Sequence, residues 1–164
     1  MKRIKRAGFT LVEIMIVVAI IALLAAIAIP NVLRGRTSAN EAAAIGNTRA
    51  LVSSLEMFRS VNAVYPTTWA QMSGANPPFS PPSFAADLVA GTVVQGFTYT
   101  YVPDPLGPPN NTYTMTAIPT VFGRTGARAF FVDESGSLRH CAEAAQGEAA
   151  DVNDTTIDAA PNAC

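Results

Sequence analysis

The sequence predicts an α+β protein in which a long N-terminal helix packs on a small antiparallel sheet of three to four strands. Three observations predict this fold. Residues 9–29 form an almost uninterrupted apolar block. Residues 38–61 repeat apolar side chains at helical spacing. The second half alternates apolar and polar residues between turn-forming segments. At 164 residues, 49% of them apolar, the chain has room for one such domain.

The apolar block comes first in the chain and fits a membrane-spanning helix. Its 21 residues would cover about 31 Å as a helix, which matches the hydrocarbon core of a bilayer. The four basic residues before Gly8 should stay on the cytoplasmic side, so that the rest of the chain faces outward. An ordinary signal anchor, a secretory signal cleaved near Ala26 and Ala28, and a specialised assembly signal all remain open at this point.

Glu13 is the one charged residue inside this block. A carboxylate there costs about 2.5–3.5 kcal/mol on insertion scales and is normally paired or functional. Cleavage between Gly8 and Phe9 would create an α-amino group four residues before Glu13. That group and the Glu13 of a neighbouring subunit would neutralise each other at low dielectric and fix the register of identical helices. The alternative is a carboxylate that only reaches back to the membrane interface.

Residues 5–13 (KRAGFTLVE), the apolar run and Pro30 closely resemble the class III signal of type IV prepilins and pseudopilins. The resemblance covers about the first thirty residues. It implies that a membrane-embedded prepilin peptidase cleaves after Gly8 and then N-methylates Phe9. It also implies that Glu13 pairs with the N-terminus of the neighbouring subunit during assembly. Pro30 and Gly35 would mark the stretch where the helix loses order on assembly.

The same resemblance implies a location and partners. The chain would be a single-pass inner-membrane precursor, with its leader (residues 1–8) removed before assembly. Identical copies would then form a helical filament at the cell surface, extended by an inner-membrane assembly platform and its ATPase. Motility, adhesion and DNA uptake are the outputs that the family implies for a pilus.

A second, amphipathic helical stretch follows, so that residues 9–62 are expected to form one long helix. Leu51, Leu55 and Phe58 recur at helical spacing, with Ala44 one heptad before Leu51. Between the two halves, Pro30 should kink or locally open the helix because it lacks a backbone donor. Glu56 and Arg59 are expected on the solvent side. The helix should end before Tyr65, because the following proline disfavours helix there.

Residues 63–164 are expected to form a globular head. Turn-rich segments at 73–84 and 103–111 separate its elements. The expected strands are 97–102, 112–118, 128–133 and 137–140, the first two antiparallel and the last two a hairpin. Because so few strands cannot bury both faces alone, the amphipathic helix should cover the sheet. The aromatic residues expected in core and cross-strand packing are Tyr99, Tyr101, Tyr113, Phe130 and Phe131.

Cys141 and Cys164 are the only cysteines. In an oxidising compartment such a pair usually forms a disulfide, which would contribute about 3 kcal/mol. Two reduced thiols or a metal pair is the alternative, although His140 leaves that set short of a four-ligand zinc site. A disulfide would close residues 142–164 into an acidic surface loop. The resemblance to major pilins implies that this loop lies on the filament exterior and carries variable interactions.

The distribution of charged residues argues against a nucleic-acid-binding protein. Without the leader, seven basic residues would face twelve acidic ones, which changes the formal net charge from −1 to −5. Residues 133–158 hold seven acidic residues and one arginine. Four arginines between Arg34 and Arg59 share the predicted helix, but the distal half has no basic patch. No dedicated nucleic-acid site is predicted.

Three functions fit these features, and the sequence favours a structural subunit of a type IV pilus. The first alternative is a pseudopilin of a type II secretion system, whose major subunit usually ends in a calcium-binding loop without a disulfide. The spacing of Asp151, Asp154 and Asp158 matches no such loop. The second alternative is a single-pass membrane-anchored or secreted binding protein. No nucleophile–base pattern is present, so neither an enzyme nor a cofactor or metal site is expected.

Overall fold

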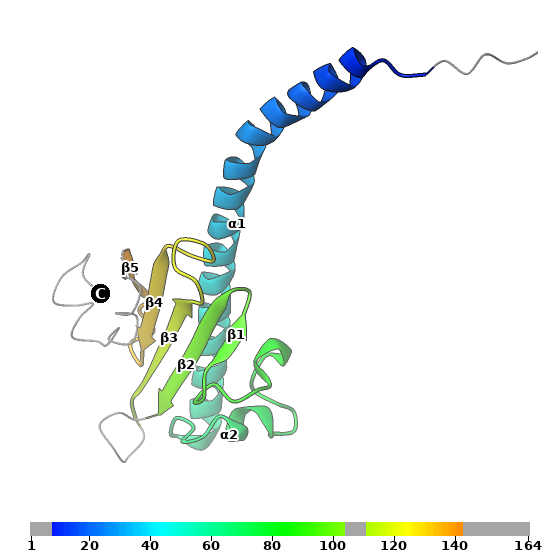
Figure 1. Ribbon diagram of the computed structural model, residues 1–164. Helices are drawn as coiled ribbons and strands as arrows, with labels where there is room; N and C mark the ends of the chain where they lie inside the picture. Colours follow the sequence, from blue (N-terminus) through cyan, green and yellow to red (C-terminus); the bar gives the residue numbers. More distant parts are fainter. Residues whose placement is uncertain (1–7, 104–110, 143–164) are drawn as a thin grey trace, which may run out of the picture. The chain divides into compact units, whose positions relative to one another are not determined.

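The computed structural model describes residues 8–103 and 111–142. Helix α1 (Leu11–Asn62) is followed by five strands that form one antiparallel sheet in the order β1-β2-β3-β4-β5 (Figure 1). The chain divides into two compact units, residues 1–35 and residues 36–164. The second half of α1 therefore belongs to the same unit as the sheet, and the α+β fold predicted from the sequence is confirmed.

In the first unit, α1 is helical from Leu11 and continues without a break through Pro30 and Gly35. The local opening predicted at Pro30 is thus not seen. The proline removes only its own N–H, and the Asn31 side-chain amide donates to the Ile27 carbonyl, 3.1 Å away. The remaining turns keep their backbone pattern, and α1 is long and apolar enough near its N-terminus to cross a membrane.

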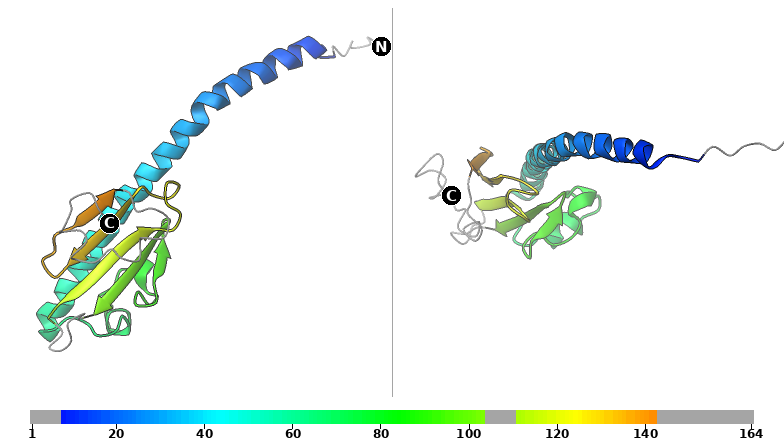
Figure 2. Two further views of the ribbon diagram at one scale, coloured as in Figure 1. Left: turned by 60° about the vertical axis from the view of Figure 1, so that its left-hand side comes forward. Right: turned by 45° about the horizontal axis from the view of Figure 1, so that its top comes forward.

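In the second unit, the rest of α1 lies along one face of the sheet (Figure 2). Its buried face includes Ala44, Leu51, Leu55 and Phe58, the residues whose spacing predicted the amphipathic helix. Burial of these side chains removes apolar surface from water at about 25 cal/mol per Å², and this drives the helix onto the sheet. The predicted helical cover of the sheet is confirmed.

The sheet has five strands, one or two more than the sequence predicted. They are β1 (Thr92–Val94), β2 (Phe97–Pro103), β3 (Tyr113–Pro119), β4 (Arg128–Asp133) and β5 (Arg139–Ala142). The positions of β2, β3 and β4 were predicted to within a residue at each end. The last strand lies two residues later than predicted, where it pairs with β4.

Strand β1 was missed because it has only three residues. It pairs with β2 through a two-residue turn, Gln95–Gly96, in which both residues have positive φ (51° and 80°). Such turns match the twist of a hairpin and favour glycine at the second position. The Gly directly before the aromatic strand, at position 96, was the signal available in the sequence.

Aromatic side chains fill the core, as predicted. Phe97, Tyr99 and Tyr101 alternate on the buried face of β2. Tyr113, Phe130 and Phe131 are also buried. Ring pairs meet edge to face, including Tyr65 with Tyr113 at 4.7 Å between centroids. The predicted packing role of these aromatic residues is confirmed.

The segment between α1 and β1 closes one end of the core. It contains α2 (Ala70–Ser73), just before the stretch 73–84 that was predicted to be loop, and a short 3-10 helix, η1 (Pro82–Phe84), inside that stretch. The buried Trp69 indole donates to the Phe84 carbonyl at 2.7 Å, which holds these two turns together. The Tyr101 hydroxyl donates to the Pro66 carbonyl at 2.7 Å. These bonds satisfy polar groups that the core would otherwise leave unpaired.

Candidate assembly site

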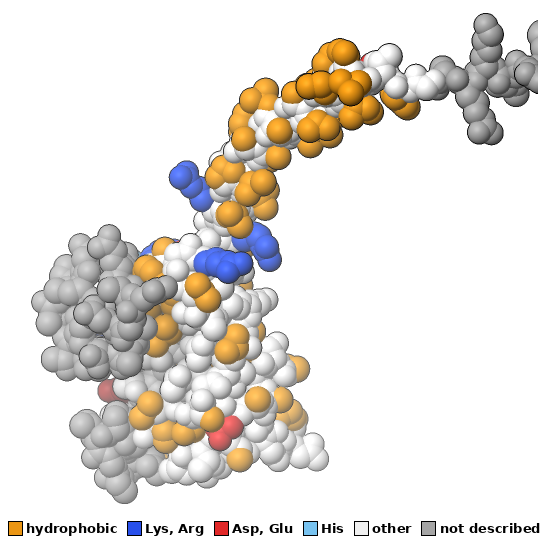
Figure 3. All heavy atoms as spheres, viewed as in Figure 1, with side chains coloured by type: hydrophobic (Ala, Val, Ile, Leu, Met, Phe, Trp, Pro, Cys, Tyr) orange, Lys and Arg blue, Asp and Glu red, His pale blue; other side chains and the backbone are white. Residues whose placement is uncertain are grey.

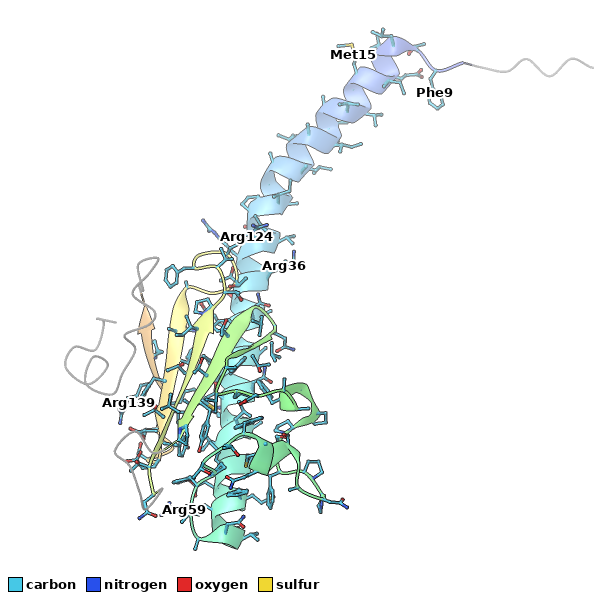
Figure 4. The ribbon with its side chains drawn as sticks, turned by 60° about the horizontal axis from the view of Figure 1, so that its bottom comes forward. Phe9, Met15, Arg36, Arg59, Arg124 and Arg139 are labelled. Atoms are coloured by element: carbon cyan, nitrogen blue, oxygen red, sulfur yellow. The ribbon has the colours of Figure 1, made fainter. Side chains whose placement is uncertain are left out.

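Residues 8–10, directly before α1, are exposed. The Phe9 side chain is 84% exposed, and it lies at the start of the helix in Figure 4. A Cβ added at Gly8 would meet no atom within 4 Å. Nothing in the described fold therefore requires a glycine at this position, and cleavage after Gly8 with N-methylation of Phe9 stays a prediction. Residues 1–7 of the predicted leader lie outside the described residues.

The Glu13 carboxylate is hydrogen-bonded to Thr10 at the N-terminus of α1. Its Oε2 accepts hydrogen bonds from the Thr10 amide and the Thr10 hydroxyl, both at 2.7 Å. The Glu13 amide in turn donates to Thr10 Oγ1 at 3.2 Å. This reciprocal arrangement is a capping box, and it satisfies donors that the first helical turn leaves free.

Thr10 is a site residue that sequence reasoning missed. The signal was present, because a threonine followed three residues later by a glutamate before an apolar run is the sequence signature of a capping box. From the sequence, Glu13 was interpreted through a partner on another subunit or through the membrane interface, and not through its own helix. The structure shows that it also has partners within its own helix.

The apolar surface beyond Glu13 surrounds the helix. Five consecutive residues, Ile14 to Val18, are each more than half exposed, and they cover more than one full turn. Figure 3 shows hydrophobic side chains over the visible face of this segment. A helix that is apolar on all sides requires apolar surroundings, either a bilayer or a bundle of similar helices.

Polar contacts join the second half of α1 to the loop before β4. Glu41 is only 8% exposed, and its carboxylate accepts from the Ala127 amide at 2.7 Å. It also forms an ion pair with Arg128, with the guanidinium nitrogen Nη2 at 2.8 Å. One residue earlier, the Asn40 side-chain amide donates to the Thr125 carbonyl at 3.1 Å. These contacts fix the register of the helix along the sheet.

A second polar cluster lies near the end of α1. The Tyr65 hydroxyl donates to Glu56 at 2.5 Å and accepts from Arg59 at 3.0 Å. Burial and the hydrogen bond to Glu56 raise the pKa of Tyr65 to about 12, although the Arg59 bond opposes this shift. Glu56 and Arg59 are exposed, as predicted, but both are engaged by this tyrosine. The cluster ties the helix end to the chain that follows it.

The predicted disulfide is only partly within the described residues. Cys141 lies in β5, where its Cα is paired with that of Ala129 in β4. Cys164 lies outside the described residues, as does the acidic segment 143–164. The disulfide and the role of the loop therefore stay predictions. Within residues 8–103 and 111–142, no group of three or more His, Cys, Asp or Glu side chains could hold a metal ion.

Comparisons with known proteins match the N-terminal motif. Residues 3–29 match the family model of the prokaryotic N-terminal methylation motif. The chain is 42% identical over 64 residues to type II secretion system core protein G of Vibrio cholerae, covering 39% of this chain and 44% of that protein. It is 40% identical over 68 residues to the core protein G of Pseudomonas aeruginosa, covering 42% and 48% of the two chains.

The chain therefore spans less than half the length of these curated relatives, and no solved structure matches it significantly. The predicted resemblance is nevertheless confirmed: the chain carries the prokaryotic N-terminal methylation motif, and over 64 to 68 residues it is similar to type II secretion system core protein G. Of the two filament classes considered from the sequence, these relatives favour the pseudopilin over the pilus subunit.

Proposed function

Because the chain carries the N-terminal motif of type IV pilin-like proteins, we propose that it is a structural subunit of a type II secretion pseudopilus. The observation that carries the proposal is the exposed apolar surface around the first half of α1, with Glu13 as its one carboxylate. A helix of this kind needs a bilayer before assembly and other helices after it. The role is structural and involves no catalytic step of its own.

Transfer from the bilayer to a filament exchanges one apolar environment for another. Lipid tails are as apolar as leucine side chains, so hydrophobic burial contributes little to association of the helices. Packing and charge pairing must then supply the free energy and the register. Glu13 is suited to this role because its carboxylate lies at the helix start, next to where cleavage after Gly8 would expose an amino group.

Assembly would exchange the partners of Glu13. In the single chain, Oε2 is held by the Thr10 amide and hydroxyl. The new α-amino group of a neighbouring Phe9 would bind the same carboxylate as a charged donor, and hydrogen bonds between ionised groups are roughly twice as strong as neutral ones. The capping box keeps Glu13 satisfied in the meantime, which lowers the cost of a carboxylate near the membrane.

A type IV pilus subunit, which the sequence favoured, is the second candidate. The observation in its favour is the cysteine pair at positions 141 and 164. The pseudopilin is preferred because homology to core protein G covers 64 to 68 residues, far more than the short motif shared by all such proteins. Loss of the gene in the native host would separate the two. A pseudopilin mutant should lose protein secretion, whereas a pilus mutant should lose surface filaments or motility and secrete normally.

Replacing Glu13 with leucine tests the proposal directly. Glu13→Leu should insert into the membrane at least as well as the original chain but should enter filaments at least tenfold less, because the charge pair worth a few kcal/mol is lost. Filaments are sheared from cells that overproduce the assembly system and quantified by immunoblot. Ile14→Leu, which changes the neighbouring exposed position without charge, is the matched control.

The second part of the test identifies the N-terminal residue of the mature chain. Mass spectrometry of the filament fraction should find a chain that begins at N-methylated Phe9. Normal filament formation by Glu13→Leu, or a mature chain that begins after Ala28, would overturn the filament proposal.

A further inference from the structure

Two exposed arginines that are distant in sequence lie close together where α1 enters the compact unit of residues 36–164. Arg36 lies on α1, and Arg124 lies in the loop between β3 and β4. The adjacent Thr37 hydroxyl donates to the Arg124 carbonyl at 3.4 Å, which brings the two backbones together across 87 positions. Figure 4 shows both side chains at this end of the unit. We call the surface formed by Arg36 and Arg124 the basic patch.

Within the described residues, the basic patch has no carboxylate partner. Both arginines are exposed, and neither forms an ion pair with a carboxylate in residues 8–103 and 111–142. The nearest buried carboxylate, Glu41, is already engaged by Arg128 and the Ala127 amide. No carboxylate of the described residues therefore competes with an outside anion for these two guanidinium groups.

The loop that carries Arg124 is held rigidly. Within the loop, the Arg124 and Thr125 amides donate to the Val121 carbonyl at 3.1 and 2.9 Å, and the Gly123 amide donates to Gly126 at 2.8 Å. A Cβ at Gly126 would lie 2.5 Å from the Phe97 ring, so only glycine allows this close packing. The loop is thus a preformed platform and not a mobile segment that must be ordered on binding.

An exposed apolar residue, Val121, lies in the same loop as Arg124. Val121 is 43% exposed, three residues before Arg124 in the same tight loop. Guanidinium groups bind phosphate oxygens in a bidentate manner, while an adjacent apolar side chain can enter the boundary between headgroups and acyl chains. This combination is suited to a lipid surface more than to a free anion.

The position of Arg36 in the chain sets its distance from the hydrocarbon core of a bilayer that α1 spans. Residues 9–29 cover about 31 Å of helix, which fills the hydrocarbon core, and the headgroup layers add roughly 5–8 Å on each side. Seven further residues carry the helix about 10 Å beyond that core to Arg36. Arg34, one turn or less before it, is also exposed. Arg34 is about 8 Å beyond the core, at the outer edge of the headgroup layer, and Arg36 is about 3 Å further out, from where its long side chain can reach back to the lipid phosphates.

We propose that the basic patch binds the anionic phospholipid headgroups of the leaflet from which α1 emerges, and so holds the head against the membrane before assembly. This inference rests on the proposed function, since it requires the apolar helix to anchor the chain in a bilayer. On leaving the bilayer for a filament, the subunit would have to release these headgroups.

The test uses the full chain in nanodiscs of phosphatidylcholine, with or without phosphatidylglycerol. Hydrogen–deuterium exchange of the amides of residues 121–126 is measured in both lipids. Each basic residue near an anionic membrane surface strengthens membrane binding about fivefold. A loop that is bound to headgroups opens less often, so phosphatidylglycerol should slow amide exchange of this loop on the order of tenfold. R36Q/R124Q should remove this lipid effect. R49Q, which changes an exposed arginine further along α1, should leave it intact.

Each outcome decides between named alternatives. Unchanged exchange of the sheet amides in R36Q/R124Q shows that the variant is folded. Equal loop exchange in both lipids for the original chain, or the same lipid effect in R36Q/R124Q, overturns the inference. Slowing that occurs only in lipid-free filaments would assign the patch to a carboxylate on a neighbouring copy, and the lipid inference would be wrong. Failure of the chain to enter nanodiscs at all would instead overturn the proposed function.

Discussion

At the scale of single residues, the two glutamates of α1 that matter most have opposite surroundings. Glu13 lies on an exposed apolar helix and is satisfied by a residue three positions away. Glu41 is nearly buried and is satisfied by residues 86 and 87 positions away. The first can exchange its partners without disturbing the fold, whereas the second is part of the fold.

Replacing Glu41 with alanine should destabilise the head. The change leaves the Ala127 amide and the Arg128 guanidinium without their acceptor, which costs about 2–3 kcal/mol. Urea unfolding of the detergent-solubilised chain, followed by the fluorescence of Trp69, measures the free energy. Glu134→Ala, at an exposed carboxylate, should change it by less than about 0.5 kcal/mol. Equal effects of the two variants would contradict a structural role for the Glu41 contacts.

Asp133 should make the unfolding free energy of the head depend on pH in the acidic range. Burial raises the pKa of Asp133, but hydrogen bonds from the Ser135 hydroxyl and amide and the Arg139 charge outweigh burial and leave the pKa below its ordinary value. The stabilisation is therefore present above the unfolded pKa, near 3.9, and is lost as the pH falls through the folded pKa.

Comparison of unfolding free energies at neutral pH and below pH 4 checks this expectation. Asp133→Asn should lower stability at neutral pH and should weaken the loss on acidification. Glu134→Gln, at the next residue, should retain the acid dependence of the original chain. An unchanged pH profile in Asp133→Asn would show that other carboxylates are responsible.

At the scale of elements, α1 combines two helices with different requirements. The first half has no buried face in the chain, whereas the second half is held by core contacts with the sheet. Pro30 lies in the first half, where one backbone hydrogen bond is missing and the helix packs on no core, although the Asn31 side chain still donates to the Ile27 carbonyl. A continuous helix at this point is therefore the least supported part of the element.

Pro30→Ala should stiffen this part of α1. Proline costs about 3 kcal/mol in a helix interior, so restoring the missing hydrogen bond should slow amide exchange around residues 26–34 by on the order of a hundredfold. Exchange is measured in nanodiscs, with Val32→Ala as a control that keeps the proline. Equal exchange in Pro30→Ala and the original chain would show that the turn is held by something other than its backbone bonds.

At the scale of the whole molecule, the chain separates a part made for assembly from a part that folds around its own core. Residues 1–35 and 36–164 form separate compact units. The homology to pseudopilins covers about two fifths of the chain, so the C-terminal cysteines remain as a feature to be tested.

A disulfide between Cys141 and Cys164 should stabilise the second unit. Cys164→Ser should lower the unfolding free energy by about 3 kcal/mol, because the loop closed by the bridge no longer restricts the unfolded chain. Reductant should lower the stability of the original chain equally and should not affect the variant. Trp69 fluorescence during urea unfolding measures both. Insensitivity of the original chain to reductant would show that the cysteines are not bridged in the mature protein.

The sequence by itself predicted the elements whose signals are local. The apolar block, Glu13 and the basic leader predicted the assembly helix, because length, hydropathy and one misplaced charge are properties of consecutive residues. Alternation around Tyr99 and Thr116 predicted two strands nearly to the residue, and the hairpin turn after Asp133 predicted a third. The capping box of Thr10 was equally local and was available to the same reasoning.

Only the tertiary structure decided which distant residues meet. The partners of Glu41, the pairing of the three-residue strand β1 and the approach of Arg124 to Arg36 all join positions that no local pattern connects. Such contacts follow from where the core packing of Leu51 and Leu55 places α1 on the sheet, since one register buries these side chains and fixes every polar contact beside them. The periodicity of apolar residues determines which face of a helix is buried, but the packing of the core determines which distant residues contact that helix.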